Sequence, residues 1–439
     1  MNYYKKIILF LPVIILAGCA IFQQEHCLDG GSNLPECPPI DAIEDDAITD
    51  IYDRRTWVPP SKLKIDPIVL GEAAQIPINS ARVKVIGPSH EDAIASLAAK
   101  IWLIENAQHT IDMTYYIFKT DLVGQAVLGA LCNAVKRGVD VRIMVDSIGS
   151  LSPGHSDLRA VETCTEEAGY MRNSSGQLTT QKARAQVVIF NAITKLQFNR
   201  RSHDKLLVVD GSFPDKAVVM TGGRNISLDY YGINADGSED LDAFRDLEIL
   251  SMSGEHSSDE DNTVGEISEI YYSLLFSHTG NRRIKPHEIP EELEEFGELN
   301  ESDEGKYENK YAAHRNESQK SLATLKAFPQ VKTQLDDMPN YMAHDFNEAQ
   351  VRLSHQLSNL TNADVTTNVV ENLERNPNSI LYLFSKIMGD ARAKDVSSGS
   401  LQIVSPYLFS GQYFDKEGEL IYDGAKDTLD WLNENPGLK

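Results

Sequence analysis

One histidine and one lysine stand two positions apart near the middle of the chain. His203 and Lys205 are followed by Asp210, then by the pair Gly222-Gly223 and by Asn225. Alternate residues of a strand share a face, so the imidazole and the ammonium are expected to point into one pocket. A nitrogen that can attack or exchange a proton, beside a fixed positive charge, suits a phosphodiester. The glycines allow the backbone to approach a ligand closely, and the asparagine supplies an amide donor.

Two short strands must hold these groups in place. Leu206–Val209 is an apolar run rich in valine and leucine, typical of a buried strand, and residues 217–220 predict the strand beside it. Gly211, Ser212 and Pro214 are turn formers and predict the connecting loop. The alternative is a β-hairpin whose histidine and lysine merely face solvent. The full pattern on an apolar strand favours a site.

The pattern from His203 to Asn225 resembles the signature of the phospholipase D superfamily. The resemblance implies cleavage or exchange of phosphodiesters through a phosphohistidine, with no metal and no other cofactor. His203 would attack phosphorus or protonate the leaving oxygen, while Lys205 and Asn225 stabilise the phosphoryl charge. Asp210, grouped with these catalytic residues, is expected to anchor the strand or to pair with Lys205. The interval before Gly222 exceeds the family's usual spacing, which we interpret as an elongated hairpin loop.

The same resemblance assigns further residues to the site. Asp246 stands where relatives carry a carboxylate that bonds the catalytic imidazole, although it could be an ordinary residue at a strand end. Together with Lys205, the residues Arg200, Arg201 and Arg224 make the site basic. The expected substrate-binding residues are Gly222, Gly223, Arg224 and Tyr116.

An α/β fold surrounds the motif. Helices are predicted after Ser89, with a cap at its first turn, and over Val123–Lys136, where Gly138 ends the helix. Strands are predicted around residues 83–85, 111–117, 139–145, 187–190 and 246–250. Strands alternating with helices indicate a layered mixed sheet with flanking helices. Residues 81–254 resemble one phospholipase D-like half-domain, and the resemblance includes the strand that carries Tyr116.

Composition limits the function. The chain has 439 residues and a net charge of −24, with 41% hydrophobic and 24% charged residues. These values are typical of a globular protein with more than one domain. A strongly acidic chain lacks the basic surface of a protein that wraps nucleic acid, so no nucleic-acid partner is expected.

The N-terminus predicts export. Lys5 and Lys6 precede an apolar run over Ile7–Ala17, which is the pattern of a signal peptide and is too short for a membrane span. The ending Leu-Ala-Gly-Cys resembles a bacterial lipobox and implies cleavage after residue 18 and acylation of Cys19. An ordinary signal peptide with a coincidental cysteine is the alternative. Ala20 favours the outer membrane, facing the periplasm, in that family of lipoproteins.

The remaining cysteines are interpreted from the sequence around them. Cys27 and Cys37 lie close together in a loop-rich segment of an exported chain and are expected to form a disulfide. Cys132 falls in an apolar helical pattern, where a buried free thiol is expected. Cys164 receives no assignment, and no cysteine or histidine cluster has zinc-like spacing.

The rest of the chain is divided by composition. Residues 19–80 are interpreted as a tether that drapes on the domain, and residues 255–399 as an acidic, partly helical linker. Residues 400–439 resemble the start of a second half: Ser400–Phe409 echoes Thr110–Phe118. Superfamily members need two motifs, and this sequence has one. The second half is therefore expected to be truncated, and a homodimer could supply the other histidine.

Three functions remain open at this point. The lipoprotein signal and the residues of the motif resemble those of bacterial cardiolipin synthases and phospholipase D-like lipases, which implies a phospholipid substrate at a membrane. An exported endonuclease of the same superfamily is the second possibility. An inactive, truncated remnant is the third.

Overall fold

The computed structural model describes residues 38–150, 155–191, 201–254, 262–284, 301–355, 357, 360, 378, 412–414, 417–434 and 436–437. Cys19, Arg200, both members of the expected Cys27–Cys37 disulfide and the whole of the repeat at 400–409 lie outside these residues.

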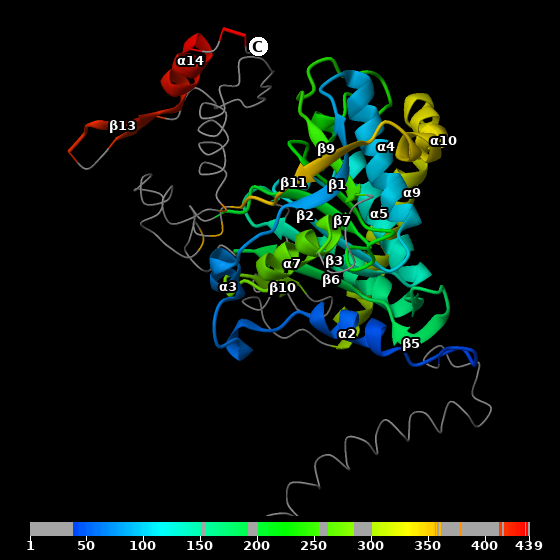
Figure 1. Ribbon diagram of the computed structural model, residues 1–439. Helices are drawn as coiled ribbons and strands as arrows, with labels where there is room; N and C mark the ends of the chain where they lie inside the picture. The colour runs from blue at the N-terminus through cyan, green and yellow to red at the C-terminus, as the bar shows by residue number, and fades with distance from the viewer. Residues whose placement is uncertain are drawn as a thin grey trace, which may run out of the picture.

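A nine-stranded mixed sheet forms the centre of the molecule (Figure 1). Its order is β10 (Arg282–Ile284), β6 (Ala185–Phe190), β3 (Asp140–Asp146), β2 (Thr110–Tyr115), β7 (Lys205–Val209), β8 (Val218–Gly222), β9 (Glu248–Ser253), β1 (Asn79–Ile86) and β11 (Asn347–Val351). β2, β3 and β6 run parallel, and the remaining neighbours pair antiparallel. The expected α/β mixed sheet with flanking helices is confirmed.

Helices cover both faces of the sheet. On one face lie α4 (His90–Asn106) and α5 (Leu122–Arg137), with α9 (Glu301–Ala327) against α5 and α10 (Pro329–Ala343) against α4. On the other face lie α3 (Pro67–Ala73) and α7 (Val264–Phe276). The shorter elements are α2 (Asp46–Arg54), η1 (Pro60–Lys62), α6 (Ser156–Glu162), η3 (Thr163–Glu167), β4 (Tyr170–Arg172), β5 (Leu178–Lys182), η5 (Leu228–Tyr230), β12 (Gln412–Phe414), β13 (Leu420–Asp423) and α14 (Gly424–Glu434).

The helix boundaries follow from local chemistry. Ser89 caps α4 and forms a capping box with Asp92, which satisfies amides that the first turn leaves free. α5 ends at Gly138, whose φ of +99° is the left-handed conformation that glycine adopts readily. Both boundaries agree with the sequence prediction.

The segment after Gly254 is more than a linker, which corrects the predicted domain boundary. β10 and β11 form the two edges of the central sheet, and α7, α9 and α10 pack on its helical layers. β10 has three residues and β11 is largely exposed, so neither shows the alternation that reveals a buried strand.

The N-terminal segment also enters the core. Arg55 follows α2 and is almost fully buried, with ion pairs to Asp112 of β2, Asp140 of β3 and Glu269 of α7. The predicted tether thus inserts a charged side chain between the sheet and α7, because three buried carboxylates need a cation.

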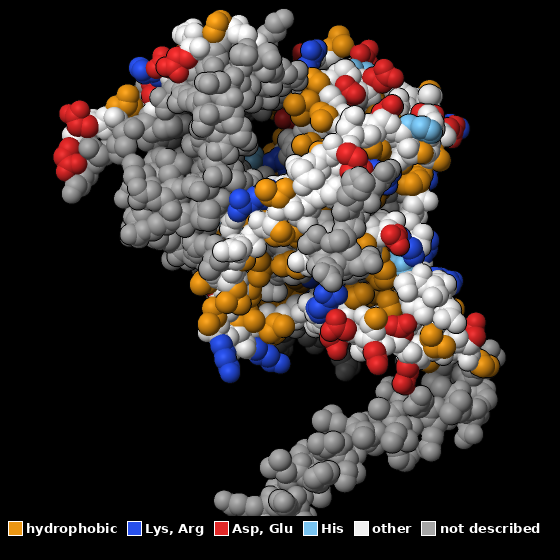
Figure 2. Space-filling view, in the orientation of Figure 1, with side chains coloured by type: hydrophobic (Ala, Val, Ile, Leu, Met, Phe, Trp, Pro, Cys, Tyr) orange, Lys and Arg blue, Asp and Glu red, His pale blue; other side chains and the backbone are white. Residues whose placement is uncertain are grey.

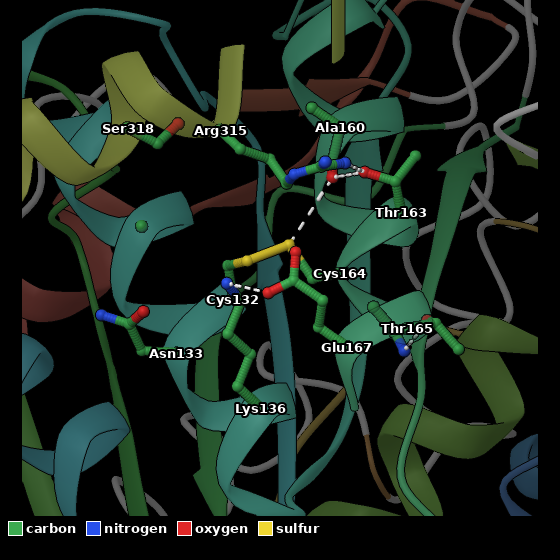
Figure 3. The surroundings of a disulfide bond; sticks show 12 residues. Cys132, Asn133, Lys136, Ala160, Thr163, Cys164, Thr165, Glu167, Arg315 and Ser318 are labelled. Atoms are coloured by element: carbon green, nitrogen blue, oxygen red, sulfur yellow. Dashed lines mark hydrogen bonds and ion pairs between the residues drawn. A yellow bond between two sulfur atoms is a disulfide. The ribbon is translucent and has the colours of Figure 1, made fainter. Parts of the chain in front are cut away.

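A disulfide joins Cys132 of α5 to Cys164 of η3 (Figure 3). The prediction of a free thiol at Cys132 is therefore wrong, although the residue is buried as expected. Sequence periodicity placed the cysteine in the helix but does not report which distant residue the helix meets.

We expect this disulfide to stabilise the fold substantially. The cysteines are 32 residues apart, and closing a loop of that size stabilises a protein by about 2–4 kcal/mol. The variant Cys132→Ser/Cys164→Ser should lose that amount in urea unfolding. Reducing agent should lower the urea concentration at which half of the parent protein is unfolded and leave that of the variant unchanged. Equal unfolding midpoints for the two proteins without reductant would contradict this role.

Candidate active site

His203 and Lys205 lie together where β7 begins. The Lys205 ammonium is 3.2 Å from Nδ1 of His203 and donates a hydrogen bond of 2.8 Å to the carbonyl of that residue. His203 is exposed, while Lys205 is buried. The two side chains therefore share one face, as the alternation predicts, with the imidazole outermost.

Tyr116 completes this group. Its ring centroid is 4.5 Å from that of His203, and the Lys205 ammonium is 5.7 Å from the same ring. The position follows from sheet pairing, because Tyr115 of β2 is opposite Lys205 and the amide of Tyr116 donates to the carbonyl of Asp204. The predicted substrate-binding tyrosine thus lies directly beside the imidazole.

The surroundings adjust the protonation of both nitrogens. Burial and the neighbouring Lys205 charge lower the pKa of His203, which keeps a larger share of the imidazole neutral and able to attack. Burial lowers the pKa of Lys205 to about 8, opposed in part by Asp204 and Asp246. The lysine therefore carries its charge below about pH 8 and loses it as the pH rises.

We expect the rate to fall on the alkaline side for this reason. If the Lys205 charge stabilises phosphoryl oxygens, kcat/KM should decrease as the pH passes about 8, where the folded-state lysine deprotonates. In Lys205→Arg the guanidinium stays charged, so the decrease should disappear even if the rate at neutral pH is lower. A pH profile of kcat/KM for both proteins checks this; an identical alkaline limb in the arginine variant would contradict it.

Two carboxylates that the sequence prediction did not assign act on the imidazole. Asp146, at the end of β3, forms an ion pair of 2.7 Å with Arg201, and its charge acts on His203. Asp204 accepts hydrogen bonds from Ser202 and from Tyr271 of α7. Each raises the pKa of His203 by its charge, against the lowering by burial. The position of Asp146 at the end of a predicted strand was the one feature of the sequence that could have pointed to it. The Asp204–Tyr271 contact joins residues 67 positions apart, so no local sequence pattern indicates it.

Asn225 and Asp210 hold backbone segments. The amide oxygen of Asn225 accepts from Ile117 at 2.9 Å, and its nitrogen donates to the Tyr230 hydroxyl at 2.8 Å. Asp210, at the opposite end of β7 from the lysine, accepts from the amides of residues 108, 109 and 110. These three bonds are the anchoring arrangement expected for Asp210, and no pair with Lys205 occurs among the described contacts.

The glycine pair packs against the segment that leads into β9. A Cβ on Gly222, whose φ is +155°, would collide with the carbonyl of Leu247, and one on Gly223 would collide with the carboxylate of Asp246. Burial raises the pKa of Asp246. The described residues include no hydrogen bond between Asp246 and His203, so the expected bond to the imidazole does not form here; Asp246 acts on Lys205 by charge instead.

Arg224 is placed differently from the prediction. Its side chain is fully buried, pairs with Glu248 at 3.4 Å and donates to the carbonyl of Gly87 at 2.6 Å. It therefore stabilises the packing of β9 and α4 rather than contacting substrate. A charged residue next to the motif suggested exposure, but the guanidinium is buried beside the carboxylate of Glu248, which Lys100 also contacts at 2.6 Å.

The described part of the chain holds no cluster of three histidine, cysteine, aspartate or glutamate side chains suited to a metal ion. None of its helices has the length and hydropathy of a membrane-spanning segment.

Comparison with known proteins identifies the domain around this site. The family model for "Cardiolipin synthase, PLD-like domain" matches residues 101–236. Cardiolipin synthase C of Escherichia coli K12 is 32% identical over 174 residues, which are 37% of this chain and 31% of that protein. A cardiolipin synthase of Clostridium perfringens SM101 is 29% identical over 144 residues, 32% of this chain and 25% of that protein. The matches thus span about a third or less of these relatives.

Among solved structures, the phospholipase D family member Nuc from Salmonella typhimurium aligns with a TM-score of 0.29 and 18% identity, covering 47% of this chain and 99% of that one. The family match spans β2, β3, β6, β7 and β8 and includes His203, Lys205 and Asn225. Residues 101–236 therefore form a phospholipase D-like domain.

Proposed function

We propose that this chain is a phosphodiesterase or phosphatidyltransferase that acts on membrane phospholipids through a phosphohistidine at His203. The observation that carries the proposal is the contact of an exposed imidazole with a buried ammonium and an aromatic ring, formed by His203, Lys205 and Tyr116. The likeness to cardiolipin synthases supports a lipid substrate.

In the proposed reaction, a ring nitrogen of His203 attacks phosphorus and the bond from phosphorus to the leaving oxygen breaks. The leaving alcohol takes a proton from a general acid, and Lys205 stabilises the negative charge on the phosphoryl oxygens. Water or a second lipid alcohol then attacks the phosphohistidine, loses its proton and breaks the nitrogen–phosphorus bond. Water gives hydrolysis, and an alcohol gives phosphatidyl transfer.

The charge of the chain favours a lipid over nucleic acid. With a net charge of −24, the chain as a whole would repel a nucleic acid.

We further propose that the general acid is the imidazole of another phospholipase D-like segment, in a second copy of the chain or elsewhere. The family resemblance supports this, because its members use two motifs. A second copy would present the same His203 across a two-fold axis.

The protein is also proposed to be anchored at the bacterial cell envelope through a lipidated Cys19. Lys5, Lys6 and the apolar run that follows support export. The disulfide between Cys132 and Cys164 also supports it, since disulfides persist in oxidising compartments.

A lipid-product assay tests the proposal. The full chain is incubated with vesicles of phosphatidylglycerol and phosphatidylethanolamine, and the products are measured by mass spectrometry; a parallel sample receives linear duplex DNA. Cardiolipin is expected if transfer dominates, and phosphatidic acid if hydrolysis does. Cleaved DNA with unchanged lipids would favour the endonuclease, and no product from either substrate would leave the chain without the proposed activity.

A further inference from the structure

Helix α3 is held firmly on the domain by its inner side. Ile68 is completely buried in a cluster that includes Phe190 of β6 and Leu206 of β7. Asp66 caps the helix and accepts from Nδ1 of His278 at 2.7 Å, which fastens the N-terminal end. Gly71 lies so close to Leu274 of α7 that a Cβ would collide with its side chain. The helix is therefore a rigid part of the domain.

The outer side of the same segment is apolar and open to solvent. Ile65, Val69 and Leu70 are 57%, 45% and 62% exposed. Figure 2 shows hydrophobic side chains gathered at the corner where α3 lies in Figure 1. Large aliphatic side chains scattered singly need no explanation, but three on one short segment form a contiguous patch.

Two lysines flank this patch. Lys62 and Lys64 are exposed, and no ion pair joins either of them to an acidic group in the described part of the chain. The segment 60–74 holds two acids, Asp66 and Glu72, and Asp66 is turned inward toward His278. Among the described side chains, two lysines without an acidic partner thus lie beside the exposed aliphatic residues, in a chain with a net charge of −24.

We propose that this surface, defined by Lys62, Lys64, Ile65, Val69 and Leu70, docks the domain on an anionic bilayer. Aliphatic side chains enter the boundary between headgroups and acyl chains, while lysines beside them meet anionic headgroups. The lysines favour a negatively charged partner, and an anionic bilayer meets both the charge and the aliphatic side chains. A second copy of this chain is the alternative, because its acidic segment 236–244 also exposes Leu241 and Phe244. The net charge of −24 opposes that association, so we assign the surface to lipid.

Docking at α3 would set the distance and tilt of the site above the lipid. Ile68 and Leu206 belong to one buried cluster, and Leu206 follows Lys205 directly. The docking surface and the catalytic strand therefore share one buried cluster. The inference concerns binding alone, so it stands or falls separately from the proposed catalysis.

A fluorescent probe at residue 70 tests the docking locally. The full chain carries Leu70→Cys with Cys19, Cys27 and Cys37 replaced by serine, while Cys132 and Cys164 remain in their disulfide. An environment-sensitive dye is attached, and the control is the same dye at Thr333→Cys, an exposed position on α10 across the sheet. The local readout is needed because the apolar run at the N-terminus can bring either protein to a vesicle.

On phosphatidylglycerol vesicles, the emission of the dye at residue 70 should shift to the blue and be quenched by brominated lipid, whereas the dye at residue 333 should not respond. Lys62→Gln/Lys64→Gln should weaken the docking equilibrium roughly tenfold or more, since each lysine near an anionic surface contributes about 1 kcal/mol.

Equal behaviour of the two dyes on phosphatidylglycerol would overturn the proposal. A response of the same size on phosphatidylcholine, or one unchanged by the lysine substitutions, would also overturn it. A blue shift without vesicles that grows with protein concentration would show a second copy on the surface, and would overturn the assignment to lipid as well.

Discussion

Replacing His203 by alanine is expected to lower kcat by at least about 10³-fold. The side chain supplies the attacking nitrogen in the proposed reaction, and no other imidazole contacts Lys205 or Tyr116 in the described part of the chain. Positioned acid–base groups alone contribute about 10²–10⁴ in rate. Because the side chain is exposed, its removal should leave the fold intact.

The matched control is His344→Ala. His344 is an exposed histidine at the end of α10, and among the described residues its ring hydrogen bonds only to the carbonyl of Asn340. This variant should keep the parent kcat in the same assay of lipid products. Similar rates for His203→Ala and the parent would remove His203 from the mechanism.

Replacing Arg55 by methionine is expected to lower the free energy of unfolding by about 3–5 kcal/mol. Arg55 contacts Asp140 at 2.8 Å, Asp112 at 2.9 Å and Glu269 at 3.3 Å, and all four side chains are nearly or fully buried. Removing one partner of a buried ion pair leaves charge that neither water nor a cation compensates. In the variant, Arg142 still contacts Asp112 and Arg184 still contacts Asp140. The buried carboxylate of Glu269 is therefore the one that loses its described cation.

Arg54→Met is the control for this measurement. Arg54 is the neighbouring arginine, about half exposed, and it pairs with the exposed Asp50. Such surface pairs contribute about 0–1 kcal/mol. Urea unfolding of both variants should separate them clearly; a loss in Arg55→Met no larger than that in Arg54→Met would mean that the N-terminal segment does not stabilise the sheet.

The sequence predicts the local parts of this site well. The alternation of His203 and Lys205, the strand after them and the cap of α4 each depend on neighbours within a few positions, and the structure confirms all three. The family resemblance adds Tyr116, which lies beside the imidazole. These features depend on residue spacing, which is directly visible in the sequence.

Long-range partners could not be predicted in the same way. The sequence predicts Arg224 as a substrate ligand, but in the fold it pairs with Glu248. It predicts Cys132 as a free thiol, but η3 brings Cys164 to α5 and the two form a disulfide. The edge strands β10 and β11 join the sheet only through pairing with distant strands. In each case, tertiary packing determines the partner, and the local sequence pattern does not indicate it.

The most direct test is to look for the lipid-derived phosphoryl group on His203. The full chain is mixed briefly with vesicles of phosphatidylglycerol labelled at phosphorus, denatured in base to preserve phosphohistidine, and digested with trypsin. The label is expected on the peptide 202–205, whose single histidine is His203. Lipid turnover without label on that peptide, at a rate that His203→Ala retains, would contradict the account.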